Sequence, residues 1–220
     1  MQLNTVIFDM DGLLIDSEPC WQEAGMETLR EFNVALTLQQ YHHTTGLRTK
    51  EWIDYWFRHF GISPASAPAA EEMIHRKAIE KIAANGTIMP GVREIFSYCS
   101  DRQFRIGLAT SSPLALVDVV VDKLGIRSFL EAIASAEDLP FGKPHPQVYM
   151  DCARLLAVSP LQCICFEDSF NGMISAKAAR MTCVVIPAPD QSALAKWGAA
   201  DLQLASLLDF GDPQWAALNR

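Results

Sequence analysis

Two acidic pairs are the residues of this sequence whose types and spacing are best suited to chemistry: Asp9 with Asp11, and Glu167 with Asp168. Each pair directly follows a short apolar run. One residue separates Asp9 from Asp11, so both carboxylates point to one side wherever the backbone stays extended. Asp-x-Asp-Gly is also good turn chemistry, which leaves a structural role open on this pattern alone.

These carboxylates need a compensating positive charge if the fold gathers them at one place. Two like charges ~4 Å apart repel by about 4 kcal/mol at an effective dielectric of roughly 20. Lys143, between Gly142 and Pro144, supplies one amine and cannot neutralise four acids. A hard divalent cation with oxygen ligands can, and a site that also binds a phosphate dianion favours Mg²⁺. Mg²⁺ is therefore the cofactor that we expect.

A candidate anion site follows the apolar run 104–109. Ser112 is a natural helix N-cap, and Pro113 is a natural first helical residue, so we predict that a helix starts there. The unpaired backbone N–H groups of its first turn, together with the Thr110 hydroxyl, would bind an anion. Simple capping, without an anion, accounts for the pattern equally well.

The elements that must position these residues alternate between strands and helices from Pro90 onward. Apolar runs that end in polar or proline-marked turns predict buried strands over 5–8, 104–109, 132–134, 163–166 and 183–186. Segments with helical periodicity separate them. The fold class predicted is α/β, with a Rossmann-like, doubly wound parallel sheet as its core. Strands in such a sheet deliver the residues that follow them to one ligand crevice.

Residues 17–86 differ, because they contain helical stripes and no strand-like run. One such stripe consists of Trp52, Ile53, Trp56, Phe57 and Phe60. Asn85-Gly86 is a plausible end for the last helix. We therefore predict an α/β core of residues 1–16 and 87–220 with an inserted helical cap of residues 17–86. Since the insertion follows the first strand, the cap should lie over the crevice as a lid.

The composition excludes several classes of protein. The chain has 220 residues, of which 50% are hydrophobic, enough for a packed globular core. The net charge of −8, without a local basic run, argues against a nucleic-acid partner. No apolar segment reaches the ~20 residues that a membrane span requires. The six cysteines lack CxxC spacing and are expected to be buried thiols. We expect a cytoplasmic protein, with a monomer as the default.

With these motifs in this order, the chain resembles the haloacid dehalogenase superfamily of phosphotransferases over nearly its whole length. The four family motifs are similar to Asp9–Leu14, to the strand ending in Thr110-Ser111, to Lys143 within Gly-Lys-Pro-x-Pro, and to Glu167–Ser169 with Asn171-Gly172. The cap between the first two motifs resembles the subgroup of β-phosphoglucomutase, phosphoglycolate phosphatase, and the 2-deoxyglucose 6-phosphate and hexitol phosphatases. The resemblance implies a phosphatase for a small sugar or polyol phosphate.

The resemblance also implies roles for the four acids. Asp9 is the nucleophile that becomes an aspartyl phosphate. Asp11 protonates the leaving oxygen and later activates water. The carboxylates of Asp9 and Asp168 hold Mg²⁺ together with the backbone carbonyl of Asp11. Glu167 is either a further metal ligand or an acceptor behind the ligands.

Other residues are expected to bind the substrate. By the same resemblance, Thr110, the Ser111 amide and Lys143 bind the phosphoryl oxygens. Asn171 belongs to the fourth motif and is assigned to substrate binding. Arg48, in the predicted cap, is the candidate that reaches down into the crevice; a solvated arginine at a helix start is the structural alternative.

Two other functions stay open. Related mutases carry a second acid/base histidine on the first cap helix, where this sequence has Trp21, and this difference disfavours a β-phosphoglucomutase-type phosphomutase. A non-catalytic phosphate-binding or Asp-phosphorylated module would also place acids and a lysine at parallel strand ends. The helical insertion and Asp11 argue against such a module.

Overall fold

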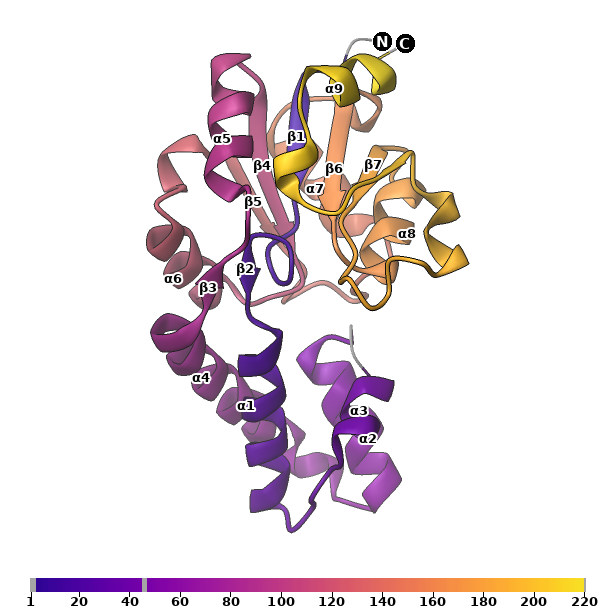
Figure 1. Cartoon of the computed structure of the whole chain (residues 1–220). Helices are drawn as coiled ribbons and strands as arrows, with labels where there is room; N and C mark the ends of the chain where they lie inside the picture. The colour runs from indigo at the N-terminus through magenta and orange to yellow at the C-terminus, as the bar shows by residue number, and fades with distance from the viewer. Residues whose placement is uncertain (1–2, 45–46, 220) are drawn as a thin grey trace.

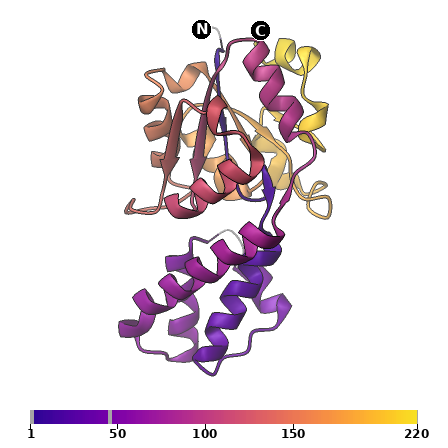
Figure 2. The same ribbon diagram turned by 90° about the vertical axis from the view of Figure 1, so that its left-hand side faces the viewer.

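The structure has a parallel sheet flanked by helices, with a further group of helices below the lower edge of the sheet (Figures 1 and 2). It is a computed structural model, and it describes residues 3–44 and 47–219. Among these residues, no helix is both long and apolar enough to cross a lipid bilayer.

The sheet has six strands in the order β5-β4-β1-β6-β7-β8, and all of its pairings are parallel. Its strands are β1 (Thr5–Phe8), β4 (Arg105–Thr110), β5 (Ala132–Ser135), β6 (Cys163–Glu167), β7 (Thr182–Val185) and β8 (Leu202–Gln203). All five predicted strands are confirmed, whereas the edge strand β8 was not predicted. The central strand β1 is buried on both faces, and Phe8 lies between Leu108 and Phe166 in the register.

Helices cover both faces of the sheet, because successive side chains of β1 point in opposite directions. Val6 and Phe8 pack into one core with α5 (Val92–Asp101) and α6 (Leu114–Leu124). Ile7 packs into the other with α7 (Gln147–Leu155) and α8 (Phe170–Ala178). The remaining core helices are α9 (Asp212–Leu218), η2 (Arg127–Phe129), η3 (Pro160–Gln162), η4 (Ala195–Ala199) and η5 (Leu207–Asp209). The doubly wound α/β fold is confirmed.

The helical cap consists of α1 (Glu18–Glu31), α2 (Leu38–His43), α3 (Thr49–Phe60), η1 (Pro64–Ser66) and α4 (Ala67–Asn85). In the aromatic stripe of α3, Trp52, Trp56 and Phe57 are buried, and Phe60 at the helix end is exposed. Helix α4 ends as predicted, with Gly86 as its C-cap. The cap lies on the side of the sheet at which β1 and β6 end (Figure 1).

Two short strands join the cap to the core. β2 (Ile15–Asp16) leads into α1, and β3 (Thr87–Ile88) follows α4. They pair antiparallel, with Asp16 opposite Thr87. Both crossings of the chain therefore run side by side as one hydrogen-bonded ribbon. β2 ends at Asp16 and β3 begins at Thr87, and the division into a core and a cap of residues 17–86 stays a prediction.

The start of α6 differs from the prediction. Pro113 is the N-cap, and Leu114 is the first helical residue. Ser112 does not cap the helix, because its backbone N–H donates to Thr110 Oγ1 and its hydroxyl donates to Asp11 Oδ2. The N–H of Leu114 donates instead to the carboxylate of Glu137. Ser112 therefore contacts the last residue of β4 and a residue after β1 instead of capping α6.

Candidate active site

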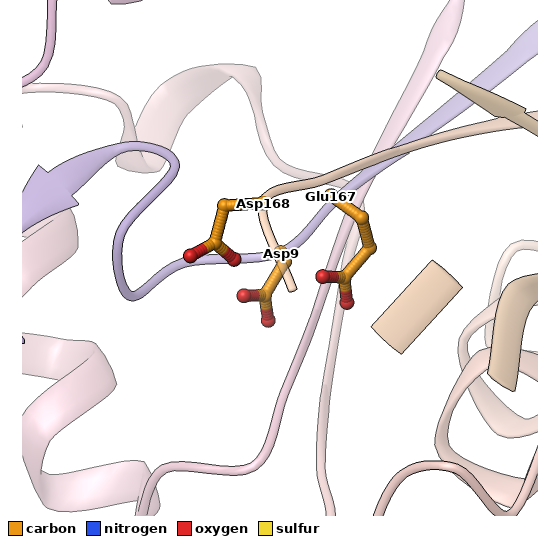
Figure 3. Close-up of side chains that lie close together, drawn as sticks. All are labelled: Asp9, Glu167 and Asp168. Atoms are coloured by element: carbon orange, nitrogen blue, oxygen red, sulfur yellow. The ribbon is translucent and has the colours of Figure 1, made fainter. Parts of the chain in front are cut away.

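Three acids meet where β1 and β6 end. Asp9 follows β1, Glu167 is the last residue of β6, and Asp168 comes next. One carboxylate oxygen from each lies within 4.8 Å of the others. Figure 3 shows the three side chains converging on one space. Asp9 is 6% exposed and Glu167 is fully buried. The sheet grows from β1 to one side with β4 and β5, and to the other side with β6, β7 and β8. The end of β1 is therefore the point at which doubly wound sheets form their ligand crevice.

Lys143 joins this cluster from the β5–α7 loop (residues 136–146). Its Nζ donates to Asp9 Oδ1 and to Glu167 Oε1, at 2.6 Å in both cases. It also donates to the Ala109 carbonyl at 3.1 Å. Burial disfavours the ammonium ion, but the two carboxylates outweigh burial and raise the pKa of Lys143. The lysine is therefore a fixed positive charge beside Asp9.

Glu167 is fully occupied by hydrogen-bond donors. Oε1 accepts from Lys143 and, at 2.5 Å, from the Tyr149 hydroxyl. Oε2 accepts from the backbone N–H and the hydroxyl of Ser169. Gly172 makes room for this carboxylate, since a Cβ there would collide with it. Of the two roles expected for Glu167, its saturation favours the acceptor that anchors Lys143 over the direct metal ligand.

Asp9 and Asp168 differ from Glu167 in the donors around their carboxylate oxygens. Within the described residues, neither Asp9 Oδ2 nor the Asp168 carboxylate accepts a side-chain hydrogen bond. Burial raises the pKa of Asp9 to about 7, with a further contribution from Glu167 and opposition from Lys143. Burial, then Glu167 and Asp9, raise the pKa of Asp168. One buried and one half-buried carboxylate whose oxygens lack side-chain donors, with excess negative charge around them, fit a hard divalent cation such as Mg²⁺.

Asp11 lies beside the three-acid cluster and faces a different set of partners. Its Oδ1 accepts from the Ser17 hydroxyl at 2.6 Å and from Trp21 Nε1 at 3.0 Å. Its Oδ2 accepts from the Ser112 hydroxyl at 2.6 Å. The turn after it needs Gly12, which has φ +75° and where a Cβ would strike Asp168. The carboxylate of Asp11 is thus held between the core and the first cap helix.

The residues expected to bind a phosphoryl group lie around this cluster. Thr110 is buried at the end of β4, and its oxygen accepts from Ser112, so its hydroxyl proton can still donate. Ser111 is half-buried in the next position, and half-buried Asn171 lies in the first turn of α8. No hydrogen bond within the described residues joins the side chain of Ser111 or Asn171 to the acids.

Arg48 is not brought to the acids. It is the N-cap of α3, and its guanidinium group bonds to Glu51 and to carbonyls of the β5–α7 loop. Three partners of the site were not identified from the sequence. Tyr149 carried a weak signal, because it follows Lys143 by six residues at the start of a helix. The roles of Ser17 and Trp21 as donors to Asp11 depend on the ribbon and had no signal in the spacing.

Comparisons with known proteins agree with this geometry. The sequence matches the family model described as "Hydrolase: haloacid dehalogenase-like hydrolase" over residues 3–180. It is 41% identical over 212 residues to hexitol phosphatase B of Escherichia coli strain K12, covering 94% of each chain. It is 29% identical to protein CbbY of Rhodobacter capsulatus, covering 94% of this chain and 96% of that protein.

Solved structures share the fold. The crystal structure of CbbY from Rhodobacter sphaeroides in complex with phosphate superimposes with a TM-score of 0.88 at 24% identity, and the match covers all of both chains. β-Phosphoglucomutase from Clostridium difficile gives a TM-score of 0.86 at 21% identity, with 99% of this chain and 97% of that chain covered. At these identities the likeness concerns the architecture alone.

Proposed function

Because the chain belongs to the haloacid dehalogenase-like hydrolase family, we propose that it is a Mg²⁺-dependent phosphatase for a small sugar or polyol phosphate monoester. One observation carries this proposal: Asp9 accepts from the buried Lys143 through Oδ1, keeps Oδ2 without a side-chain donor, and belongs to one cluster of carboxylates with Asp168. The name of the 41% identical relative, hexitol phosphatase B, supports the substrate class. The net charge of −8 supports a small-molecule partner rather than nucleic acid, and we propose a cytoplasmic monomer.

The proposed chemistry has two displacements at phosphorus. Asp9 Oδ2 forms a bond to phosphorus while the bond to the sugar oxygen breaks, and Asp11 gives that oxygen a proton. Asp11 then takes a proton from water, whose oxygen attacks phosphorus, and the aspartyl bond breaks to release phosphate. Asp11 must first turn away from Ser17, Trp21 and Ser112, which occupy both of its oxygens.

The residues around Asp9 would hold the charge of the transferred group. The carboxylates of Asp9 and Asp168 and the Asp11 carbonyl would hold Mg²⁺, which would supply positive charge beside the phosphoryl group. Lys143 and the Thr110 hydroxyl donate to the same oxygens. The backbone N–H of Ser111 and the side chain of Asn171 complete the proposed phosphoryl site.

We propose hydrolysis rather than transfer back to a sugar. A mutase needs a second group that accepts a proton from a sugar hydroxyl. Trp21 holds the position on α1 where the related mutases carry a histidine, and its indole N–H is a donor only. The cap, residues 17–86, would select the sugar. Substrate binding by Arg48 would require its guanidinium group to leave its present carbonyl partners.

The test is an assay of purified protein with p-nitrophenyl phosphate and a panel of hexitol and sugar phosphates, with Mg²⁺ or with EDTA. We expect hydrolysis that requires the metal, and an acid-labile phosphoenzyme that Asp9→Asn abolishes. Inactivity of the wild-type protein toward the whole panel would instead support the non-catalytic module. With β-glucose 1-phosphate and a bisphosphate primer, glucose 6-phosphate formed faster than free phosphate would identify a mutase.

A further inference from the structure

Arg48 forms a polar bridge between the cap and the core. From the N-terminus of α3, Nη1 donates to the Leu139 carbonyl at 2.8 Å and to the Ala136 carbonyl at 3.1 Å. Nη2 donates to the Pro140 carbonyl at 3.3 Å. All three acceptors belong to the β5–α7 loop, about ninety positions away in the sequence. The side chain of Arg48 is only 11% exposed.

Glu51 fixes the same guanidinium group from the cap side. Its Oε1 accepts from Nε of Arg48 at 3.1 Å and from Nη2 at 2.8 Å. Its Oε2 accepts from the backbone N–H of Arg48 at 3.2 Å. Arginine has five N–H donors, and all five are engaged by Glu51 and the three carbonyls. In this arrangement Arg48 has no donor left for a substrate phosphate.

The loop is shaped to receive this arginine. A Cβ on Gly142 would lie 2.5 Å from both Cδ and Nε of Arg48, so a glycine is needed for the approach. The next residue is Lys143, whose Nζ reaches Asp9 and Glu167. Asp138, Pro140 and Phe141 of this loop are exposed. The arginine therefore orders an exposed segment that carries the buried lysine of the site.

We propose that Arg48 is a positioning residue whose hydrogen bonds to the β5–α7 loop form a clasp between the cap and the core. Through this clasp, the position of the cap over the site and the position of Lys143 depend on each other. The fork of the guanidinium group is what permits simultaneous bonds to three carbonyls and a carboxylate. A lysine at this position would keep the charge but present a single ammonium, which cannot span these acceptors. For its kinetic readout this inference rests on the proposed phosphatase function.

The first test compares Arg48→Ala and Arg48→Lys with the wild-type protein by hydrogen exchange of residues 136–146 without substrate, and by kcat and KM. We expect faster exchange in both variants and a fall of about tenfold or more in kcat/KM, the effect typical of lost charge-assisted hydrogen bonds. Arg58→Ala, an exposed arginine on the same helix, is the matched control. Unchanged exchange in Arg48→Ala, or full rescue by lysine, would overturn the clasp and return Arg48 to substrate binding.

The second test is a double-mutant cycle with Gly142→Ala. The added methyl displaces Arg48 without removing its charge, so we expect exchange as fast as in Arg48→Ala. In the Arg48→Ala background the same methyl should add little, because the atoms that it strikes are absent. Additive effects would contradict the clasp. If the wild-type protein showed no hydrolytic activity, the proposed function would be wrong. The exchange data would still decide the role of Arg48.

Discussion

At the scale of single residues, the site depends on the donors that surround each carboxylate. All four hydrogen bonds to Glu167 come from donors within the protein, whereas Asp9 Oδ2 and the Asp168 carboxylate accept no side-chain hydrogen bond within the described residues. This division separates the acid that anchors Lys143 from the acids that can hold a cation. Tyr149 is central to the division, because its hydroxyl donates to Glu167 and accepts from Lys143 at 3.1 Å.

Tyr149→Phe should therefore impair catalysis and leave the fold intact. The ring stays in place, but Glu167 and Lys143 each lose a buried partner, for which we expect a fall in kcat of about tenfold or more. The measurement is steady-state hydrolysis beside a thermal melt. Tyr98→Phe is the control, since the Tyr98 hydroxyl bonds to Asp212 in an exposed position. Equal activity of both variants would show that Tyr149 has no part in holding the lysine.

At the scale of elements, two glycines set the distance between neighbouring segments at the site. Gly12 lets the turn after β1 pass Asp168, and Gly172 lets the first turn of α8 lie against Glu167. Ser169 completes this junction, because it caps α8 through Gly172 and also donates to Glu167. The end of β6 and the start of α8 are thus joined through one carboxylate.

Gly172→Ala tests this junction. Glycine to alanine within a helix ordinarily stabilises by roughly 1 kcal/mol. Here we expect a lower melting temperature and a loss of activity, because the Cβ collides with Glu167 and displaces it from Lys143. Gly198→Ala is the matched control, with open space around its Cβ. If Gly172→Ala were as stable and active as the wild type, Glu167 could move away from the added Cβ without loss of stability or activity.

At the scale of the whole molecule, folding brings the carboxylate of Asp9 together with those of Glu167 and Asp168, which lie far from it in the unfolded chain. The pKa of Asp9 rises from 3.8 to about 7, so the folded protein binds more protons than the unfolded chain between these values. The contribution of Asp9 to the free energy of unfolding is accordingly present below 3.8 and is lost as the pH rises through about 7. A bound cation should restore it, because it favours the ionised carboxylate.

We therefore expect Mg²⁺ to raise the melting temperature more at about pH 8 than at about pH 5.5, where protons compete for Asp9. The measurement is a set of thermal melts with MgCl₂ and with NaCl at matched ionic strength. Equal shifts at the two pH values, or equal shifts with the two salts, would contradict a cation site that includes Asp9.

The sequence predicts the parts of this molecule that leave a local pattern. Thr5–Phe8 and the other continuous apolar runs became buried strands, and the acids after them met at one edge. β8 escaped prediction because Leu202 and Gln203 are a two-residue edge strand without an apolar run. The donors to Asp11 and the loop carbonyls that bind Arg48 could not be predicted, since they come from segments that only the tertiary fold brings together.

The paired crossings of β2 and β3 have a consequence for how such enzymes diversify. Asp16 and Thr87 lie opposite each other, so we expect that a helical module of different length could replace residues 17–86 without moving the strands of the sheet. We expect the catalytic chemistry to survive such an exchange provided that the graft retains a tryptophan for Asp11 and an arginine for the β5–α7 loop. We expect the inserted module to determine which sugar phosphate is bound.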